Sequence, residues 1–275
     1  MLNKIEIQRK DGGVLTLPIY DSTDFTIKEI QGLDPVRANI VTSNFAHIDG
    51  TQFQSSRREM RNLIFTLLID SMNPFKSVQE LRKELYSFLM PKTDITLRFF
   101  RSNTDILTIS GQVESFDSPI FVKEPQANIS ILCFDPDFKD INNSLFSGTT
   151  VTTAIDSDII YTGEVDSGFI FTLYPNATTT TFTLQNTLLD GSVKKLIFES
   201  LSDPILAGEV ITISTIPGDK YVRLTKDGNT SSILWGLDPA SEWVSLYPGT
   251  NKIRVSSNTS GMSYTISYYT RFGGL

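Results

Sequence analysis

The sequence predicts a mainly β protein of two domains, and three observations carry that prediction. Apolar residues alternate with polar ones in many short runs, one amphipathic helix interrupts the runs, and turn residues recur regularly after residue 168. A chain of 275 residues is long enough for one large or two ordinary domains with a real core. Only 20% of the residues are charged and 18 are Phe, which excludes a disordered or fibrous protein.

The first 146 residues are predicted to form a β-sandwich or split barrel with one helix. Ile5 and Ile7 alternate with polar residues, and turn residues follow this first run. After the turn, Leu15, Leu17 and Ile19 alternate with polar residues in the same way. Further strands are expected by the same pattern, and the full set is Lys4 to Gln8, Val14 to Tyr20, Phe25 to Ile30, Leu63 to Ile69, Ile95 to Arg101, Ile106 to Val113 and Ala127 to Phe134.

The helix is predicted to begin after Ser77. Ser77 and Glu80 have the spacing of a capping box, in which each side chain bonds the main-chain amide of the other residue. Beyond them an apolar stripe recurs at helical spacing, and Pro91 marks the end of the helix. The stripe consists of Val78, Leu81, Leu85, Phe88 and Leu89, and we expect it to cover an open end of the sheet.

Between Asp140 and Gly168 the alternation loosens into residues typical of turns and linkers. We therefore place the domain boundary near Ser147, with residues 1–146 before it and 147–275 after it. We also expect proteases to cut in this stretch and to leave two folded fragments.

The second domain is predicted to be an antiparallel sandwich of the jelly-roll kind, because short strands alternate with turn signals such as Asp190-Gly191 and Pro217-Gly218. The expected strands are Phe169 to Tyr174, Thr180 to Gln185, Lys194 to Glu199, Val210 to Thr215, Tyr221 to Thr225, Ile233 to Leu237, Trp243 to Leu246, Lys252 to Ser256 and Ser263 to Tyr269.

A projecting arm is predicted around Asp49-Gly50. Asp-Gly between extended flanks is a strong hairpin signal, because both central residues of a type I′ turn have positive φ. The flanks, Ile40 to Phe45 and Thr51 to Ser56, are mostly polar, so a lone ribbon of this kind is hardly stable in water. The arm needs a surface to lie against.

The chain has one cysteine and one histidine, and this excludes much of enzyme chemistry. No disulfide can form within the chain, and no site can be built from several Cys or His ligands. We interpret Cys133 as a small buried residue of a strand, and His47 as a loop residue without catalytic duty.

Two groups of side chains are weighed as binding or catalytic sites. The acid pair Glu164 and Asp166, and Glu242 beside Trp243, are better interpreted as solvated charges than as glycosidase carboxylates. Four aromatic residues of the second domain form a candidate platform for stacking sugars, with packing in the core as the favoured alternative. These residues are Tyr221, Trp235, Trp243 and Tyr247.

The basic cluster of Arg57, Arg58 and Arg61 is weighed as a nucleic-acid site. A net charge of −7 and the adjacent Glu59 argue against phosphate binding, and pairing with acids across a subunit contact fits better. No phosphate-cradling glycine loop and no metal-binding carboxylate array is present, so no cofactor or metal is expected.

The N-terminal residues Met1 to Lys10 lack the apolar core of a secretory signal, and no apolar stretch approaches the ~20 residues that span a bilayer. We therefore expect the protein to fold in a cytoplasm.

Several stretches, in this order and spacing, resemble the distal tail protein (Dit) family of long-tailed bacteriophages. They are Gly32-Leu33-Asp34-Pro35, Asn44 to Gly50, Ser55 to Asn62, Ile129 to Phe138, Trp243 to Asn251 and Tyr268 to Leu275. The resemblance covers both halves of the chain.

The resemblance implies a non-enzymatic structural protein of the virion tail tip, assembled in the bacterial host cytoplasm. Its first domains would join as a homohexameric ring that binds the tail tube protein on one side and the tail-associated hub or fibre protein on the other. DNA would pass through the central channel without specific binding, and no membrane partner is expected. The second domain would be a peripheral galectin-like sandwich able to carry receptor-binding proteins.

The interface is expected at the arm and the basic cluster, that is, at Phe45, His47, Asp49, Gly50, Phe53, Arg57, Arg58 and Arg61. The rival hypothesis is a carbohydrate-binding module that recognises host cell-surface glycans through the second domain. Its platform would consist of Tyr221, Trp235 and Trp243.

Overall fold

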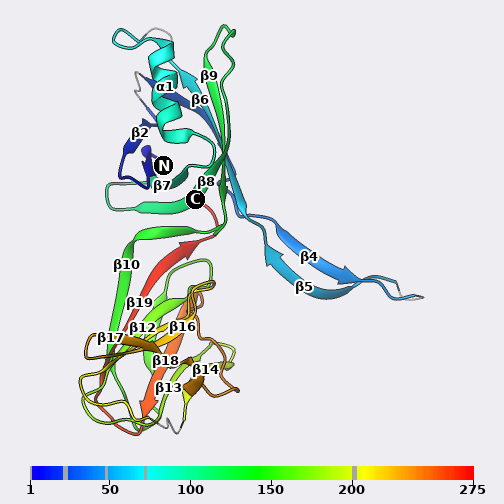
Figure 1. Ribbon diagram of the computed structural model, residues 1–275. Coiled ribbons are helices and arrows are strands. Elements are labelled where there is room, and N and C mark those ends of the chain that lie inside the picture. Colours follow the sequence, from blue (N-terminus) through cyan, green and yellow to red (C-terminus); the bar gives the residue numbers. More distant parts are fainter. Residues whose placement is uncertain (1, 21–23, 47–48, 71–72, 200–202) are drawn as a thin grey trace. The chain divides into compact units, whose positions relative to one another are not determined.

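Alternating apolar residues form paired antiparallel strands in both halves of the chain (Figure 1). The computed structural model describes residues 2–20, 24–46, 49–70, 73–199 and 203–275. They fold as two units, the first built from residues 1–141 and 272–275 and the second from residues 142–271. The chain therefore passes from the first unit to the second within β10 (Phe138–Thr149) and returns within β19 (Ser263–Phe272).

Seven strands of the first unit pair in the order β2-β1-β7-β8-β9-β6-β3, and the start of β10 pairs with β8. The long strand β8 pairs with β7 over Ile106–Gln112 and with β9 over Gln112–Asp117, and a register shift lies between Val113 and Ser115 in the second pairing. The bounds are β1 (Lys4–Arg9), β2 (Val14–Pro18), β3 (Phe25–Gln31), β6 (Arg61–Ile69), β7 (Asp94–Phe100), β8 (Ile106–Asp117) and β9 (Gln126–Cys133).

One apolar core is shared by the strands of this unit and by its helix α1 (Val78–Leu89). Alternate residues of β1, β2, β6, β7 and β9 point into it, which confirms the strands expected in this half. The capping box is also confirmed, because Ser77 Oγ accepts from the Glu80 amide and Glu80 Oε2 accepts from the Ser77 amide at 2.7 Å. Leu81, Leu85 and Leu89 are fully buried against the sheet.

The second unit is an antiparallel sandwich around its own core, as expected. One sheet has the order β17-β16-β15-β12-β19 with β10 beside β19, and the other has the order β11-β18-β13-β14. The bounds are β11 (Ser157–Tyr161), β12 (Phe169–Tyr174), β13 (Phe182–Thr187), β14 (Val193–Phe198), β15 (Val210–Ser214), β16 (Tyr221–Lys226), β17 (Asn229–Ser232) and β18 (Gly249–Ser257).

The prediction of a linker after Asp140 is wrong for the first part of that stretch. Residues up to Thr149 continue β10, and Asn143 donates to Ser267 Oγ at 2.7 Å. Pairing with β19 thus overrides the local turn propensity of this stretch. Because residues 272–275 also belong to the first unit, one cut after Asp140 does not yield two complete fragments. The assignment of ring formation to residues 1–146 and a peripheral role to residues 147–275 stays a prediction.

Two of the strands expected in the second unit are absent. Leu234–Gly236 forms a 3₁₀ helix, η1, where a strand from Ile233 to Leu237 was predicted. The stretch from Trp243 to Leu246 buries Val244 and Leu246 but makes a single bridge, between Leu246 and Ser167. Alternating burial is therefore satisfied there without a strand ladder.

Candidate functional site: the β4–β5 hairpin and its root

The strands β4 (Ala38–Ser43) and β5 (Gln52–Arg58) form a ribbon of their own, as the sequence predicts (Figure 1). Among the described strands they pair only with each other. Every residue of the two strands is exposed except the half-buried Ser43. Such an isolated ribbon is marginal in water by itself, so this hairpin is the part of the described chain that most needs a partner.

The hairpin has one apolar face. Thr42 pairs with Phe53 and Ile40 pairs with Ser56, and paired residues lie on the same face of a ribbon. Ile40 and Phe53 therefore share a face, with exposed fractions of 60% and 62%. A register shift beside Val41 produces this arrangement, because without it Phe53 would lie on the face of Val41.

The tip of the hairpin differs from the expected two-residue turn. Eight residues separate β4 from β5, and of Asp49 and Gly50 only Gly50 has a positive φ, at 94°. The tip is therefore a longer loop and not a type I′ turn. Phe45 is 54% exposed within it, and His47 lies outside the described residues.

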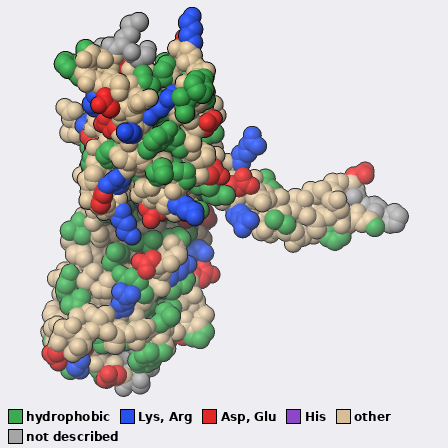
Figure 2. Space-filling model, turned by 45° about the horizontal axis from the view of Figure 1, so that its top comes forward, with side chains coloured by type: hydrophobic (Ala, Val, Ile, Leu, Met, Phe, Trp, Pro, Cys, Tyr) green, Lys and Arg blue, Asp and Glu red, His purple; other side chains and the backbone are tan. Residues whose placement is uncertain are grey.

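Charged side chains are sparse along the hairpin and gather at its root (Figure 2). There the Arg58 guanidinium forms a two-pronged ion pair with Asp137, with Nη2 at 2.8 Å from Oδ2. The Asp137 side chain is completely buried and that of Arg58 is 39% exposed. Two parallel hydrogen bonds fix orientation as well as distance, so this pair ties the end of β5 to the loop after β9.

Arg61, the first residue of β6, is 1% exposed and lies inside its own chain. Its guanidinium donates to four carbonyl oxygens, which belong to three segments that meet at the root. Nε donates to the Pro136 carbonyl at 2.6 Å, and Nη2 donates to the Gly273 carbonyl at 2.5 Å. Nη1 donates to two carbonyls, that of Gly32 and that of Asp34, and the distance to Asp34 is 2.7 Å.

The packing around Arg61 completes this hub. The guanidinium carbon lies 4.4 Å from the centre of the Phe138 ring. Burial lowers the pKa of Arg61 below its ordinary value, yet an arginine keeps its charge in proteins. The expectation that Arg61 pairs with acids of another subunit therefore does not fit its position, and we leave Arg61 out of the proposed interface.

The turn beside Arg61 requires a glycine at position 32. Its φ is +88°, and a Cβ there would lie 2.0 Å from the Asn62 carbonyl oxygen. The turn Gly32-Leu33-Asp34-Pro35 thus approaches β6 closely enough for Arg61 to reach two of its carbonyls. Leu33 also accepts from the amide of Leu275, at 3.1 Å.

Sequence reasoning missed the buried role of Arg61, although a signal was present. Arg61 has the same parity as Leu63, Phe65, Leu67 and Ile69, all of which face the core of the first unit. Period-two alternation therefore places the Arg61 side chain inside. Arg57 lies outside, pairs with Asn39 across the hairpin, and forms no ion pair with the described residues.

Comparison with known proteins gives one family match and several structural matches. Residues 162–272 match the family model of the siphovirus-type tail component, C-terminal domain. The crystal structure of Dit (gp 19.1) from phage SPP1, described as a paradigm of the hub adsorption apparatus in phages infecting Gram-positive bacteria, matches with a TM-score of 0.69 and 15% identity. The match covers 98% of this chain and 99% of that one.

Residues 162–272 thus match a tail-component family, and the whole chain shares its fold with a distal tail protein. The resemblance stated from the sequence is thereby confirmed, by the family model for residues 162–272 and by the fold for the chain as a whole. A chain of the activated phage P2 baseplate with Ca matches more weakly, with a TM-score of 0.45, 11% identity, and coverage of 97% and 98%. Comparison with curated proteins gives no match.

The candidate sugar platform of the second unit is only partly open. Arg223 lies 4.0 Å from the centre of the Tyr221 ring, and Lys220 Nζ lies 5.1 Å from that of Trp243. Trp235 is 61% exposed in η1, so the preference for its burial in the core is wrong. No cation or ring contact covers Trp235 among the described residues.

The remaining candidates form no reaction centre in the described chain. Glu242 is held by Lys194 at 2.7 Å, as a surface ion pair. Cys133 is fully buried, and burial raises its pKa to about 12, which leaves it an inert thiol at neutral pH. In the described ranges, no three His, Cys, Asp or Glu residues lie close enough to hold a metal ion, and no helix has the length and apolar character to span a membrane.

Large apolar side chains are exposed on two loops of the first unit. They are Phe75, at 88%, and the consecutive residues Ile120, Phe121 and Val122, of which Phe121 is 98% exposed. Each loop is held by a hydrogen bond, since Arg82 donates to the Pro119 carbonyl at 2.6 Å and the Phe75 amide donates to Asn73 Oδ1 at 2.8 Å. Ordered loops that expose such residues are typical of contact surfaces.

Proposed function

We propose that this chain is the hub of a phage tail tip, in which six copies join through their first units into a ring around a channel for DNA. The β4–β5 hairpin carries the proposal. It is a two-stranded ribbon with an exposed apolar face, and its root is tied by Arg58 to Asp137. A folded element of this kind is stabilised by a neighbour that covers it.

A hairpin that lies against a different surface of the next copy makes a head-to-tail contact. Contacts of this type close into a ring when the rotation per copy divides a full turn. The interface residues that we retain are Phe45, Asp49, Gly50, Phe53, Arg57 and Arg58, to which the structure adds Ile40; His47 is kept from the sequence.

The partners of the ring are proposed to be the tail tube protein on one side and the tail-associated hub or fibre protein on the other. The exposed loops around Phe75 and Phe121 suit such contacts, because they present apolar side chains that the first unit itself does not cover. The second unit is proposed to lie at the periphery and to carry receptor-binding proteins.

DNA is proposed to pass through the channel without specific binding. The net charge of −7 supports this, because binding to nucleic acid needs a surplus of Lys and Arg that neutralises phosphates. Of the basic cluster, Arg61 is buried and Arg58 pairs with Asp137. We expect double-stranded DNA to migrate unshifted with the protein at physiological salt, and a salt-sensitive shift would contradict this part.

The protein is proposed to assemble in the bacterial host cytoplasm and to reside at the tail tip of the virion. One buried cysteine and no other thiol suit folding in a reducing compartment. Electron microscopy of the purified chain in negative stain tests the hub. Rings with a central hole support it, and particles of one chain at every protein concentration would overturn it.

Binding of host cell-surface glycans is a second candidate, favoured by the exposed Trp235. An uncovered indole can stack on the apolar face of a sugar ring. Titration of bacterial cell-wall polysaccharide against the parent and Trp235→Ala tests this function. A loss of binding in the variant supports it, and no binding by the parent removes it. Tyr221→Ala serves as the matched control, because Arg223 already covers that ring.

A further inference from the structure

The strand β19 leads out of the second unit into residues 272–275, which belong to the first unit and which we call the strap. Figure 1 marks the end of this red segment with C, among elements of the first unit. Phe272 and Leu275 pack against the core of the first unit, and Arg101 lies 5.6 Å from the centre of the Phe272 ring. The strap therefore completes the first unit, although it follows the whole second unit in the sequence.

Hydrogen bonds join the strap to the root of the hairpin. The Leu275 amide donates to the Leu33 carbonyl at 3.1 Å, and Arg61 donates to the Gly273 carbonyl at 2.5 Å. One of the four carbonyls around the buried Arg61 guanidinium is thus supplied by the strap.

The strap also packs closely on the turn that precedes the hairpin. A Cβ on Gly274 would lie 3.1 Å from Pro35 Cδ, which is tighter than ordinary packing. Since β4 begins at Ala38, the strap holds the chain just before the first strand of the hairpin.

The residue before the strap is held by the second unit. The Arg271 amide donates to the Tyr161 hydroxyl at 2.9 Å, and the Arg271 carbonyl accepts from the Glu164 amide at 2.9 Å. Tyr161 is buried in the core of the second unit, and its hydroxyl donates to the Val165 carbonyl at 2.8 Å. The folded second unit thus fixes the point from which the strap leaves.

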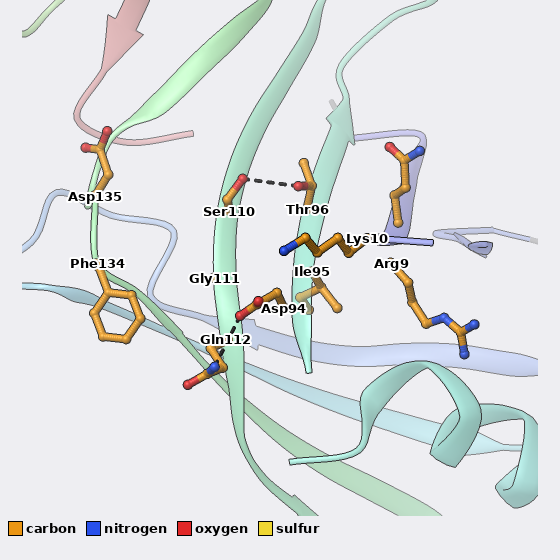
Figure 3. Close-up of a pocket in the computed structure, with 11 residues that line it drawn as sticks. Arg9, Lys10, Asp94, Ile95, Thr96, Ser110, Gly111, Gln112, Phe134 and Asp135 are labelled. Carbon is orange, nitrogen blue, oxygen red and sulfur yellow. Dashed lines mark hydrogen bonds between the residues drawn. The ribbon is translucent and has the colours of Figure 1, made fainter. Parts of the chain in front are cut away.

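The loop after β9 is the third segment that meets at Arg61. Its outer residues Phe134 and Asp135 line an open hollow (Figure 3), and Asp135 pairs with Lys139 at 2.9 Å. Its Pro136 carbonyl accepts from Arg61 on the inside. Cys133, directly before this loop, is fully buried, so its thiol reports whether the root is closed.

We propose that the strap is a checkpoint for assembly. The first unit, with the root of its hairpin, is complete only after the second unit has folded and delivered residues 272–275. During synthesis residues 1–141 emerge first and lack the Gly273 acceptor and the two apolar side chains of the strap. Chains with an unfinished second unit are thereby kept out of the ring. This inference rests on the proposed function, because it adds a condition to ring formation.

Tyr161→Phe tests the link between the two units. The change removes the hydroxyl that holds Arg271 and leaves the strap sequence intact. We expect Cys133 to react about tenfold faster with an aromatic disulfide reagent, because a lost hydrogen bond makes opening of the root more frequent. Light scattering should show a smaller assembled fraction. Tyr264→Phe is the matched control, since Tyr264 is buried in the same core but lies near the other end of β19.

Gly274→Val displaces the strap directly, because its side chain would meet the Pro35 ring. We expect faster reaction of Cys133 and no ring. The fluorescence of Trp235 and Trp243 should stay as in the parent, because both tryptophans of the chain lie in the second unit.

The outcomes separate the checkpoint from the ring. If the parent assembles and both variants match it in Cys133 reactivity and in assembly, the checkpoint is overturned and the ring stays. Changed tryptophan fluorescence in Gly274→Val also overturns the checkpoint, because the strap would then support the second unit. A parent that never assembles overturns the ring and the checkpoint together.

Discussion

The hairpin and its root lie next to each other in the chain and are built in opposite ways. The strands β4 and β5 expose nearly every residue, including the apolar Ile40 and Phe53. At the root, Arg61 and Asp137 are buried, and both bind groups of their own chain. Arg61 donates to main-chain carbonyls, and Asp137 pairs with Arg58.

This contrast separates two kinds of contribution by arginine. Arg61 stabilises the fold, because its buried guanidinium donates to four carbonyl groups of three segments. Arg57 has no such duty and is available to a partner. Substitutions at the root are therefore expected to change folding, and substitutions on the hairpin are expected to change assembly.

The largest effect is expected from Arg61→Ala. The change leaves the carbonyls of Gly32, Asp34, Pro136 and Gly273 without their donor and opens a cavity over Phe138. Breaking a buried charged network of this kind costs about 3 to 5 kcal/mol of unfolding free energy. Denaturation in urea, followed by circular dichroism, measures the loss.

Arg57→Ala is the matched control for this prediction. Arg57 is exposed, so we expect its unfolding free energy to stay within about 0.5 kcal/mol of the parent. Equal losses in the two variants would show that burial of Arg61 does not distinguish them.

A smaller effect is expected from Asp137→Asn, which removes the charge that holds Arg58. Arg58 is 39% exposed, so solvent screens part of the interaction. We expect a loss of about 1 to 2 kcal/mol in unfolding free energy and faster proteolysis of residues 38–58. The same change at Asp135, whose pair with Lys139 is exposed, should cost less than about 1 kcal/mol. A larger loss at Asp135 than at Asp137 would contradict the root described above.

Ser77→Ala tests whether stability and assembly are separable. Ser77 caps α1, away from the hairpin in the sequence, and loss of such a cap costs about 1 kcal/mol. We expect lower stability with unchanged assembly, measured by urea denaturation and by light scattering. Loss of assembly in this variant would mean that any destabilisation disrupts the particle.

The same cap predicts a dependence on pH. Hydrogen bonds from the Ser77 amide and hydroxyl lower the pKa of Glu80 below its ordinary value of 4.5. A lowered pKa adds stability above the unfolded value, and this stability is lost as pH falls through the folded one. The difference between parent and Glu80→Gln should therefore shrink in acid below pH 4.5. A difference that grows in acid would contradict the assigned bonds.

The smallest effect is expected at Cys133, which lies in β9 next to the root. With a pKa of about 12 and no exposed surface, its thiol should not react with an aromatic disulfide reagent at pH 8 until the protein unfolds. Absorbance of the released thiolate measures this. Fast reaction in the folded parent would show that the core beside the root is open.

Much of the fold could be predicted from the sequence, because local and tertiary preferences agree there. The capping box at Ser77 and the alternation in Leu63 to Ile69 gave α1 and β6 correctly. The hairpin was also predicted, from Asp49-Gly50, although the turn itself is longer than two residues.

The errors have a common cause, which is long-range pairing. Asn142 to Ser144 have turn propensity but lie in β10, beside β19, a strand more than a hundred residues later. Arg61 was assigned to a subunit contact because its four carbonyl partners are remote in the sequence, Gly273 among them. The apolar face of the hairpin depends on a register shift that composition does not reveal.

The central claim is that the exposed apolar face of the hairpin holds copies of the chain together. Size exclusion with light scattering on the parent and on the double variant Ile40→Ser, Phe53→Ser tests it most directly. We predict a six-chain particle for the parent, a single chain for the double variant, and equal melting temperatures. Val41→Ser, on the opposite face of the hairpin, should assemble like the parent. A double variant that assembles as fully as the parent would contradict the claim.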